Sequence, residues 1–401
     1  MRILFLTPWF PAHKHDQMGN FILDSVESLV NLGHTVIILV SESWKPKIAG
    51  LFCKDWIKKK VQVEEFSDKF NLYFCHYFSI PRAYLNSMSI YSYRKNINPM
   101  LKKLVIQYQC HLIHAHTEIS GVSAVDVGSE LGIPTVITLH GISTERKLYS
   151  GKSKKLLFEY TLRNANCVIL VGNALMEFGK QFVNNIDNFR VVPNGFRHNL
   201  YNSITYNKSW LDNHLRFISV SNLHEGKGIE INLYALAKLK NTGVTKWTYK
   251  IIGAGDQKKY LQALVIELDL SKQVSFLGAC SHDEVYNNLS QADIFTLPSY
   301  REAFGVAYTE AMSCGLLTIG VKGQGPQDFI EHGKTGFLVP PKDVDALSSL
   351  FKKICASRDN MREIAEAGKK YIHNNFTWKN HAISLLKVYC ELVKDSEYIQ
   401  N

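Results

Sequence analysis

The chain has no apolar run of 18 or more residues, which is the length that a helix needs to cross a bilayer, so no spanning helix is expected. Its eight cysteines are scattered, and no two of them stand in a C-x-x-C spacing. This distribution argues against a disulfide scaffold or a zinc site and predicts reduced thiols, as in a cytosolic protein. With 46% hydrophobic and 20% charged residues over 401 positions, the composition is that of a globular protein long enough for two domains.

Several catalytic and cofactor motifs are also missing. The sequence contains neither the G-x-x-x-x-G-K-[ST] phosphate loop nor the G-x-S-x-G elbow of serine hydrolases. Gly253-Ala254-Gly255 follows an apolar segment, as a dinucleotide-binding turn would, but Lys258 stands where the third glycine is required. We therefore interpret the glycine pair as a tight strand-to-helix turn rather than an NAD(P) site, and we expect no cofactor.

Positive charge is concentrated in the first half of the chain. The net charge is +10, and residues 1–200 hold 23 basic against 15 acidic side chains. Such an imbalance suggests an anionic partner, and the aromatic and basic stretches at 44–60 and 91–103 favour an anionic membrane surface. A merely solvated basic surface is the alternative. No helix-turn-helix, zinc-finger, RRM or KH pattern occurs, so no nucleic-acid partner is expected.

Short apolar segments alternate with helical patterns along both halves of the chain. The expected strands are 3–7, 36–40, 112–114, 135–139 and 167–171 in the first half, and 216–220, 249–252, 274–277, 294–297 and 317–320 in the second. This alternation predicts an α/β fold with two doubly wound parallel sheets. The polar segment 196–213 interrupts the rhythm and is expected to link the two domains.

Two carboxylates, Glu302 and Glu310, stand eight positions apart after the expected strand 294–297. Gly305 lies between them and should open a helix, whose first N–H groups and positive dipole end suit a phosphate. Eight residues correspond to roughly 800° of helical rotation, so the two carboxylates cannot share one helical face. We therefore place Glu302 on the loop and Glu310 in the helix. A surface helix with two solvated acids is the alternative.

A lysine and three histidines stand at other strand ends. Lys227, within Gly226-Lys227-Gly228, offers a point charge for a phosphate, although a surface lysine in a flexible turn would have the same pattern. His114 and His116 are two apart and would share one face of a strand, which could begin a metal site. No carboxylate or cysteine stands close enough in sequence to complete it, so we expect no metal. His140 is a candidate for hydrogen bonding to a sugar hydroxyl or phosphate, whereas His114 has core-like neighbours and suits a structural role.

Taken together, these motifs resemble the retaining GT-B glycosyltransferases of family 4 over nearly the whole chain. The matching segments, in the family's order, are 33–36, 114–116, 139–141, 193–195, 226–228, 252–255, 302–311 and 333–339. The opening segment 7–21 is similar to members that build bacterial surface polysaccharides. The resemblance implies two Rossmann-like domains that face a deep cleft: an acceptor domain at 1–200 and a donor domain at 201–377. It also implies that a last helix within 378–401 returns to the first domain.

The resemblance assigns roles to individual residues. Lys227 would bind the donor diphosphate, Glu310 the ribose hydroxyls, and Glu302 the transferred sugar, with His140 lying over that sugar. Further donor-binding positions that it implies are Gly19, Asn194, Asn222, Gly253, Gly278, Phe304, Gly305 and Val306. Lys227 and the helix end at Gly305 would stabilise the leaving diphosphate in place of a metal ion.

The reaction that the resemblance implies is a metal-independent, retaining transfer of a sugar. The donor would be a nucleotide-sugar, with a UDP-sugar favoured and a GDP-sugar possible. The acceptor would be a lipid-linked or surface glycan in capsule, O-antigen or exopolysaccharide synthesis. The protein would then be cytoplasmic, with a peripheral place on the inner face of the plasma membrane.

Two positions depart from the family pattern. Asn222 stands where an arginine usually precedes the lysine by five residues, and Arg146, Lys147 or Arg301 would have to replace that charge. The first loop has the single Gly19 where many members have a glycine pair. The alternatives are a catalytically weak nucleotide-sugar-binding protein and a GT-B nucleotide-sugar epimerase, for which the first domain offers no convincing catalytic acid.

Overall fold

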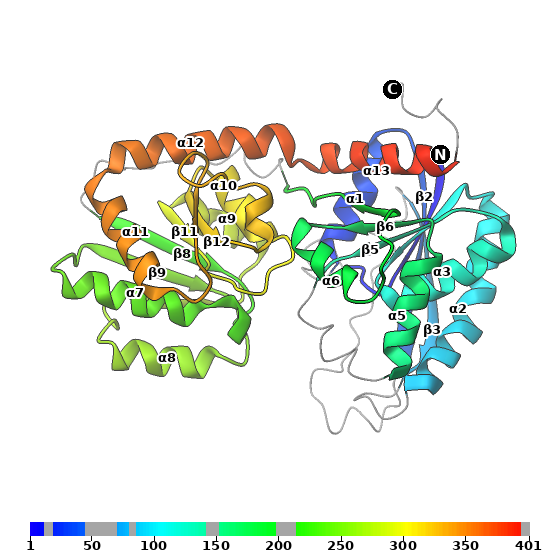
Figure 1. The fold of residues 1–401 in the computed structure, drawn as a ribbon, viewed down its shortest axis with the longest axis horizontal. Coiled ribbons are helices and arrows are strands. Elements are labelled where there is room, and N and C mark those ends of the chain that lie inside the picture. The colour runs from blue at the N-terminus through cyan, green and yellow to red at the C-terminus, as the bar shows by residue number, and fades with distance from the viewer. Residues whose placement is uncertain (12–18, 45–69, 80–85, 142–151, 198–213, 394–401) are drawn as a thin grey trace. The chain divides into compact units, whose positions relative to one another are not determined.

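The computed structural model describes residues 1–11, 19–44, 70–79, 86–141, 152–197 and 214–393. They divide into two compact units, shown in Figure 1. The first unit comprises Met1–Pro193 together with the C-terminal stretch that begins at Trp378, and the second is Asn194–Thr377. Most of the expected linker lies outside the described residues.

A parallel sheet with the strand order β3-β2-β1-β4-β5-β6-β7 forms the centre of the first unit. Its strands are β1 Arg2–Thr7, β2 Thr35–Trp44, β3 Asn71–Phe78, β4 Leu112–His116, β5 Thr135–Leu139, β6 Cys167–Leu170 and β7 Phe189–Val191. The central strands β4, β5 and β6 are buried along their whole length because helices cover both faces of the sheet, and even their polar side chains, such as His114 and Thr138, are buried.

The helices of the first unit form two layers. They are α1 Asn20–Asn31, α2 Asn86–Tyr108, α3 Glu118–Leu131, α5 Lys152–Asn164, α6 Met176–Lys180 and α13 Trp378–Val393. Helices α1 and α13 pack together and share a core with Ile3 and Phe5 of β1. Helices α2, α3 and α5 pack against one another, and α3 covers the face of β5 that carries Ile137. The last helix of the chain thus belongs to the first unit (Figure 1).

The second unit repeats the architecture with the strand order β10-β9-β8-β11-β12-β13, again parallel. Its strands are β8 Leu215–Val220, β9 Trp247–Ile252, β10 Val274–Gly278, β11 Ile294–Thr296, β12 Leu317–Val321 and β13 Phe337–Val339. Its helices are α7 Ile229–Asn241, α8 Lys258–Glu267, α9 His282–Ser290, α10 Val306–Ser313, α11 Val344–Ala356 and α12 Arg358–Asn375, with the single turns η6 Glu225–Lys227 and η7 Gly325–Asp328. Because all strands point the same way, their carboxyl ends meet at one edge, where the loops that precede α7, α8 and α10 gather.

Two further observations bear on the expectations from sequence. No helix in the described part of the chain is both long and apolar enough to cross a membrane. The cysteines within the described ranges are free thiols, namely Cys75, Cys110, Cys167, Cys280, Cys314, Cys355 and Cys390.

Candidate functional site

The loop that carries Lys227 packs directly on the loop that follows β11. The carbonyl oxygen of Gly226 accepts hydrogen bonds from the Tyr300 N–H at 3.0 Å and from the Ser299 hydroxyl at 3.2 Å. A Cβ atom at Gly228, where φ is +67°, would lie 2.3 Å from the Pro298 carbonyl oxygen. Both glycines therefore permit one loop backbone to approach another, and this contact holds the loop of Lys227 against the loop after β11.

Lys227 and Glu302 meet across this contact. The Lys227 ammonium donates to the Glu302 carboxylate at 2.7 Å, and their side chains are only 25% and 12% exposed. Glu302 is held from its other side as well, because its N–H donates to the Gln324 side chain at 3.0 Å and its carbonyl accepts from the Gly325 N–H at 3.0 Å. Gln324 lies on the loop after β12.

The loop residue Glu302 leads into α10, and Gly305 is the N-cap of that helix. Its φ of +93° favours glycine, and a Cβ there would lie 2.5 Å from the Tyr308 ring. Glu302 lies beside the positive end of this helix, because a Cβ at Gly305 would be 3.2 Å from the Glu302 Cγ. Next in the chain, Val306 is the first residue of α10. Phe304 contributes only its backbone, because its ring is buried against Phe329.

Glu310 lies in α10 and is 7% exposed. The His282 ring nitrogen Nδ1 is 3.9 Å from one of its carboxylate oxygens, at the start of α9. Burial and the neighbouring Arg197 charge lower the pKa of His282, so its ring is neutral at pH 7. His282 was not identified from sequence, since nothing local distinguishes it from any other residue at a helix start.

Three loops stack at the neighbouring strand ends, after β8, β9 and β10. The Gly253 N–H donates to the Gly278 carbonyl at 2.7 Å, and a Cβ at Gly253 would lie 1.8 Å from the Ser221 carbonyl oxygen. The next residue, Asn222, is exposed on the same loop as Lys227. The glycines thus hold the donor-side loops together, while Asn222 leaves a neutral side chain at the family's arginine position.

One of the three residues expected to replace that arginine lies in the described part of the chain. Arg301 stands next to Glu302, and its stem lies about 3.1 Å from where a Cβ of Gly226 would be. The other two replacements considered, Arg146 and Lys147, lie outside the described residues.

The first unit holds two of the candidates at the ends of β1 and β5. Gly19 is the N-cap of α1 with φ +82°, and a Cβ there would lie 2.8 Å from the Phe10 nitrogen. His140 packs against the rings of Trp9 and Phe21, with centroids at 6.1 and 4.6 Å. Its burial lowers the pKa to about 3, so the ring stays neutral and can act only as a neutral hydrogen-bonding group.

His140 continues into a row of buried histidines. Its Nε2 lies 3.0 Å from Nδ1 of His116, so one ring must donate and the other accept. His114 is stacked beside them and bonds to the Tyr389 hydroxyl at 2.6 Å and to Thr138 at 2.7 Å. Within the described residues, neither these histidines nor any other group of three or more His, Cys, Asp or Glu side chains is arranged so that it could hold a metal ion. The contact between His116 and His140 couples the tautomers of the two rings, while His114 connects the sheet to α13 through Tyr389.

The remaining candidate, Asn194, is buried at the start of the second unit. The second unit therefore holds Asn194, Asn222, Lys227, Gly253, Gly278, Glu302, Phe304, Gly305, Val306 and Glu310, and the first holds Gly19 and His140.

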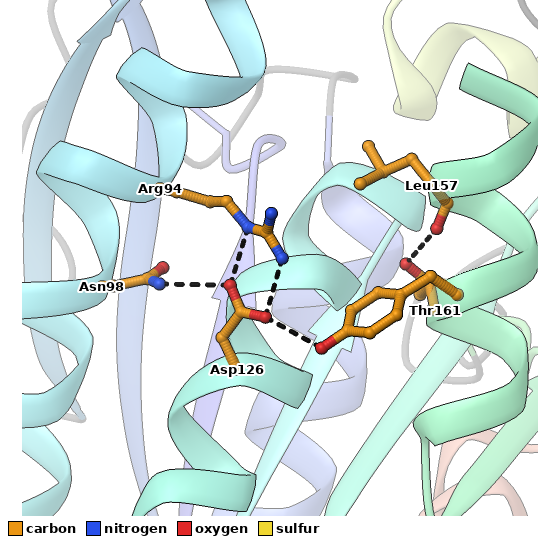
Figure 2. Close-up of polar contacts among 6 residues, drawn as sticks. Arg94, Asn98, Asp126, Leu157 and Thr161 are labelled. Carbon is orange, nitrogen blue, oxygen red and sulfur yellow. Dashed lines mark hydrogen bonds and ion pairs between the residues drawn. The ribbon is translucent and has the colours of Figure 1, made fainter. Parts of the chain in front are cut away.

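The basic stretch 91–103 lies on α2, and part of its charge is neutralised. Figure 2 shows Arg94 donating to both oxygens of Asp126 on α3, at 2.7 and 2.8 Å, with Asn98 adding a third bond. Lys102 pairs with Glu130 in the same way. The stretch thus attaches α2 to α3, and it leaves fewer free cations than the sequence suggests. The stretch 44–60 lies outside the described residues, apart from Trp44.

Two family models of glycosyltransferases together match most of the chain. The family model "Glycosyl transferases group 1" matches residues 207–371, and the model "Glycosyltransferase Family 4" matches residues 18–200. The chain is 27% identical over 292 residues to an uncharacterised glycosyltransferase of Methanocaldococcus jannaschii, an alignment that spans 69% of this chain and 74% of that protein. It is 32% identical over 168 residues to the amylovoran biosynthesis glycosyltransferase AmsK of Erwinia amylovora, which spans 40% of this chain and 41% of that protein.

A solved structure gives the same fold. Anabaena HepE, in complex with UDP, superposes with a TM-score of 0.74 at 19% identity, covering 98% of this chain and 100% of that one. Two Rossmann-like parallel-sheet units with this likeness make the fold GT-B.

Proposed function

Because the chain belongs to the family 4 glycosyltransferases of group 1, we propose that it transfers a sugar, with retention, from a UDP-sugar to a growing surface glycan. A GDP-sugar is the alternative donor. The acceptor is a lipid-linked or surface glycan, and the reaction takes place in the cytoplasm at the inner face of the membrane. The amylovoran relative, which is named for a polysaccharide, supports this class of acceptor.

The observation that carries the proposal is the Lys227–Glu302 pair at the positive end of α10. When the bond between sugar and diphosphate breaks, negative charge grows on the diphosphate, and Lys227 with the first N–H groups of α10 stabilises it. Glu302 accepts hydrogen bonds from the sugar hydroxyls, and the buried Glu310 accepts them from the ribose. The leaving phosphate takes the acceptor proton on the same face, which gives retention.

This arrangement supplies positive charge without a metal ion, so we expect transfer to persist in EDTA. Arg301 adds the second cation that Asn222 does not provide, because it stands on the loop that packs against Gly226. An Asn222→Arg, Arg301→Gln double variant should therefore bind UDP as the wild type does, whereas Arg301→Gln alone binds it more weakly.

Substitutions at Lys227 and at Glu302 should change UDP affinity in opposite directions. In the wild type the Glu302 carboxylate competes with a diphosphate for Lys227, so Glu302→Gln should bind UDP at least as tightly while transfer falls steeply. Lys227→Met should lose both, with UDP affinity lowered at least about tenfold. Lys334→Met removes an exposed lysine paired with Glu331 and serves as the control.

Binding is measured by thermal shift with UDP, GDP, ADP and CMP in EDTA, and transfer by release of nucleotide from the matching sugar donor. Stabilisation by one nucleotide that Glu310→Ala abolishes names the base. Product anomers followed by NMR decide between retention and inversion. Wild-type turnover in folded Lys227→Met would refute the assignment, and nucleotide binding with no turnover on any acceptor would favour the nucleotide-sugar-binding alternative.

The membrane part of the proposal is supported by one face of α2. Met88, Tyr91 and Ile106 are 54%, 67% and 58% exposed on it. The exposed Lys95 and Lys103 interleave with them at helical spacing. An apolar stripe bordered by lysines is typical of a helix that lies on an anionic bilayer.

Vesicle sedimentation at low salt tests this face. The Lys95→Glu, Lys103→Glu variant should bind phosphatidylglycerol vesicles more weakly than the wild type, while a Lys334→Glu control keeps its binding. Equal sedimentation of all three proteins would contradict the assignment of this face.

A further inference from the structure

A groove of about 680 Å³ opens in the second unit beside the loops that carry Lys227 and Glu302. Its volume is within the range of roughly 300–1,000 Å³ that is usual for ligand pockets. The residues that line it are Glu225, Glu230, Ile231, Tyr234, Gln257, Tyr260, Tyr300, Lys342 and Val344. None of the donor-site candidates is among them, so the groove is a separate feature.

Three tyrosines give the groove aromatic surface. Tyr234 on α7 is 37% exposed and Tyr260 on α8 is 48% exposed, which is high for large rings that line a concavity. The third ring, Tyr300, is held in place by the Lys342 ammonium 4.4 Å from its centroid. Fixed aromatic rings at the wall of a groove offer flat apolar faces together with phenolic hydroxyls.

Two carboxylates lie among these rings. Glu230 stands four residues before Tyr234 and so shares its face of α7. Glu225 and Glu230 line the groove together with Tyr300, and after burial their charges raise the pKa of that tyrosine. Burial also raises the pKa of Glu230 itself, so this carboxylate is short of water. A partly desolvated carboxylate is a strong hydrogen-bond acceptor for a hydroxyl.

The charge balance of the groove narrows the class of ligand. Two glutamates against one lysine make it acidic within a chain of net charge +10. Such a surface disfavours nucleotides, phosphates and acidic sugars. Uncharged sugars match both features of the groove: their hydroxyls can donate to its carboxylates, and their C–H faces can pack on its tyrosine rings.

We propose that this groove binds a segment of an uncharged glycan, with Tyr234, Tyr260 and Tyr300 against the sugar faces and Glu225 and Glu230 accepting from hydroxyls. Glu225 belongs to the same single turn, η6, as Lys227. Two residues apart in a 3₁₀ turn are about 240° apart around its axis, so the two side chains point to different sides of one turn. A glycan in the groove would therefore contact the side of η6 that carries Glu225, and it would not compete with a nucleotide-sugar for Lys227.

Saturation-transfer NMR on the full chain tests the site without any donor. The probes are maltohexaose and cellohexaose as free glycans, and dodecyl maltoside below its micelle concentration as a lipid-linked one, with maltose as its matched control. We expect saturation of sugar protons that excess UDP does not remove. Preference for dodecyl maltoside over maltose would identify a lipid-linked source, and equal binding a free chain.

Tyr260→Ala should weaken this binding at least about tenfold and leave transfer to a small acceptor unchanged. Glu230→Gln, which keeps the shape of the side chain, should weaken it as well. Tyr371→Ala removes a tyrosine of similar exposure, 39%, on α12 and should have no effect. The proposal is overturned if no glycan binds, if UDP displaces the glycan, if Tyr260→Ala binds like the wild type, or if tetramethylammonium binds in place of sugar. Since no donor is present, these results stand whether or not the proposed transfer is found.

Discussion

Acidification should unfold the first unit earlier than the second, because of the buried histidines around β4 and β5. Burial lowers the pKa of His140 to about 3 and that of His381 to about 4. His381 joins α13 to the rest of the unit through Ser25 at 3.1 Å and the Pro193 carbonyl at 2.7 Å. In the unfolded chain such rings take up a proton below about pH 6.5.

The magnitude follows from proton linkage. Above pH 6.5 both states are neutral at these rings and stability does not change. As the pH falls from 6.5 toward the folded values, only the unfolded state binds the proton, so stability falls by about 1.4 kcal/mol per pH unit for each histidine. Between pH 7.5 and 5 this amounts to about 2 kcal/mol for His140 and about the same for His381. His114 and His116, whose pKa values burial also lowers well below the usual range, add to this loss.

Urea titrations at pH 7.5, 6 and 5, followed by hydrogen exchange of separate peptides, report on each unit. Peptides from β4 and β5 should lose protection at lower urea as the pH falls, and those from β8 and β11 much less. His140→Asn should lower the pH slope of the first unit by about one proton near pH 5. His224→Asn, an exposed histidine of the second unit, should leave that slope unchanged. A slope below one proton, or an imidazole NMR signal of His140 that titrates near pH 6.5, would refute the reasoning.

The remaining predictions concern stability. Gly253→Ala should cost about 2 kcal/mol or more, because its Cβ would lie 1.8 Å from the Ser221 oxygen at φ +135°. Gly278→Ala, with φ +76° and no atom within 4 Å, should cost only about 1 kcal/mol of backbone strain, and equal urea midpoints for the two variants would contradict the packing argument. Asp126→Asn removes the charged partner of Arg94 shown in Figure 2 and should cost about 1 kcal/mol at the half-exposed pair. A double-mutant cycle with Arg94→Met checks this, and a coupling energy of zero would show that the pair contributes nothing.

The elements predicted from sequence are those whose pattern is local. Strands such as β4 and β5 are buried on both faces of the sheet, and their apolar residues stand close enough together to be recognised in a short window. Gly305 as the start of a helix also follows from neighbours in the chain. The edge strand β3 was not predicted; its side chains are partly buried or exposed, although its sequence is largely apolar and aromatic. Helix α2 was not assigned either, since Pro99 interrupts its sequence.

The charged residues of the candidate site were predicted from sequence, but the residues that contact and position them were not. Lys227 and Glu302 are 75 residues apart in the chain, and each was identified from its own motif. Gln324, which holds the Glu302 backbone, and His282, beside Glu310, carry no motif. Their roles arise only when separate strands bring their loops to one edge of the sheet. His114 was assigned a structural role from its apolar neighbours in the sequence. Its hydrogen-bond partner Tyr389 is 275 residues away and could not be found from a local pattern.

The glycines of the sequence motifs make contacts between loops that the motifs alone do not reveal. From sequence, Gly253 was interpreted as part of a tight strand-to-helix turn, and Gly226 and Gly228 were noted as the neighbours of Lys227. In the structure each lies against a neighbouring loop: Gly226 and Gly228 against the loop after β11, and Gly253 against the loop after β8. A side chain at any of them would move Lys227 relative to Glu302 or to α10, because the loops share these contacts. The distance between the charges of Lys227 and Glu302 therefore depends on glycines that bear no charge, and Gly226 is also the residue against which the Arg301 side chain packs.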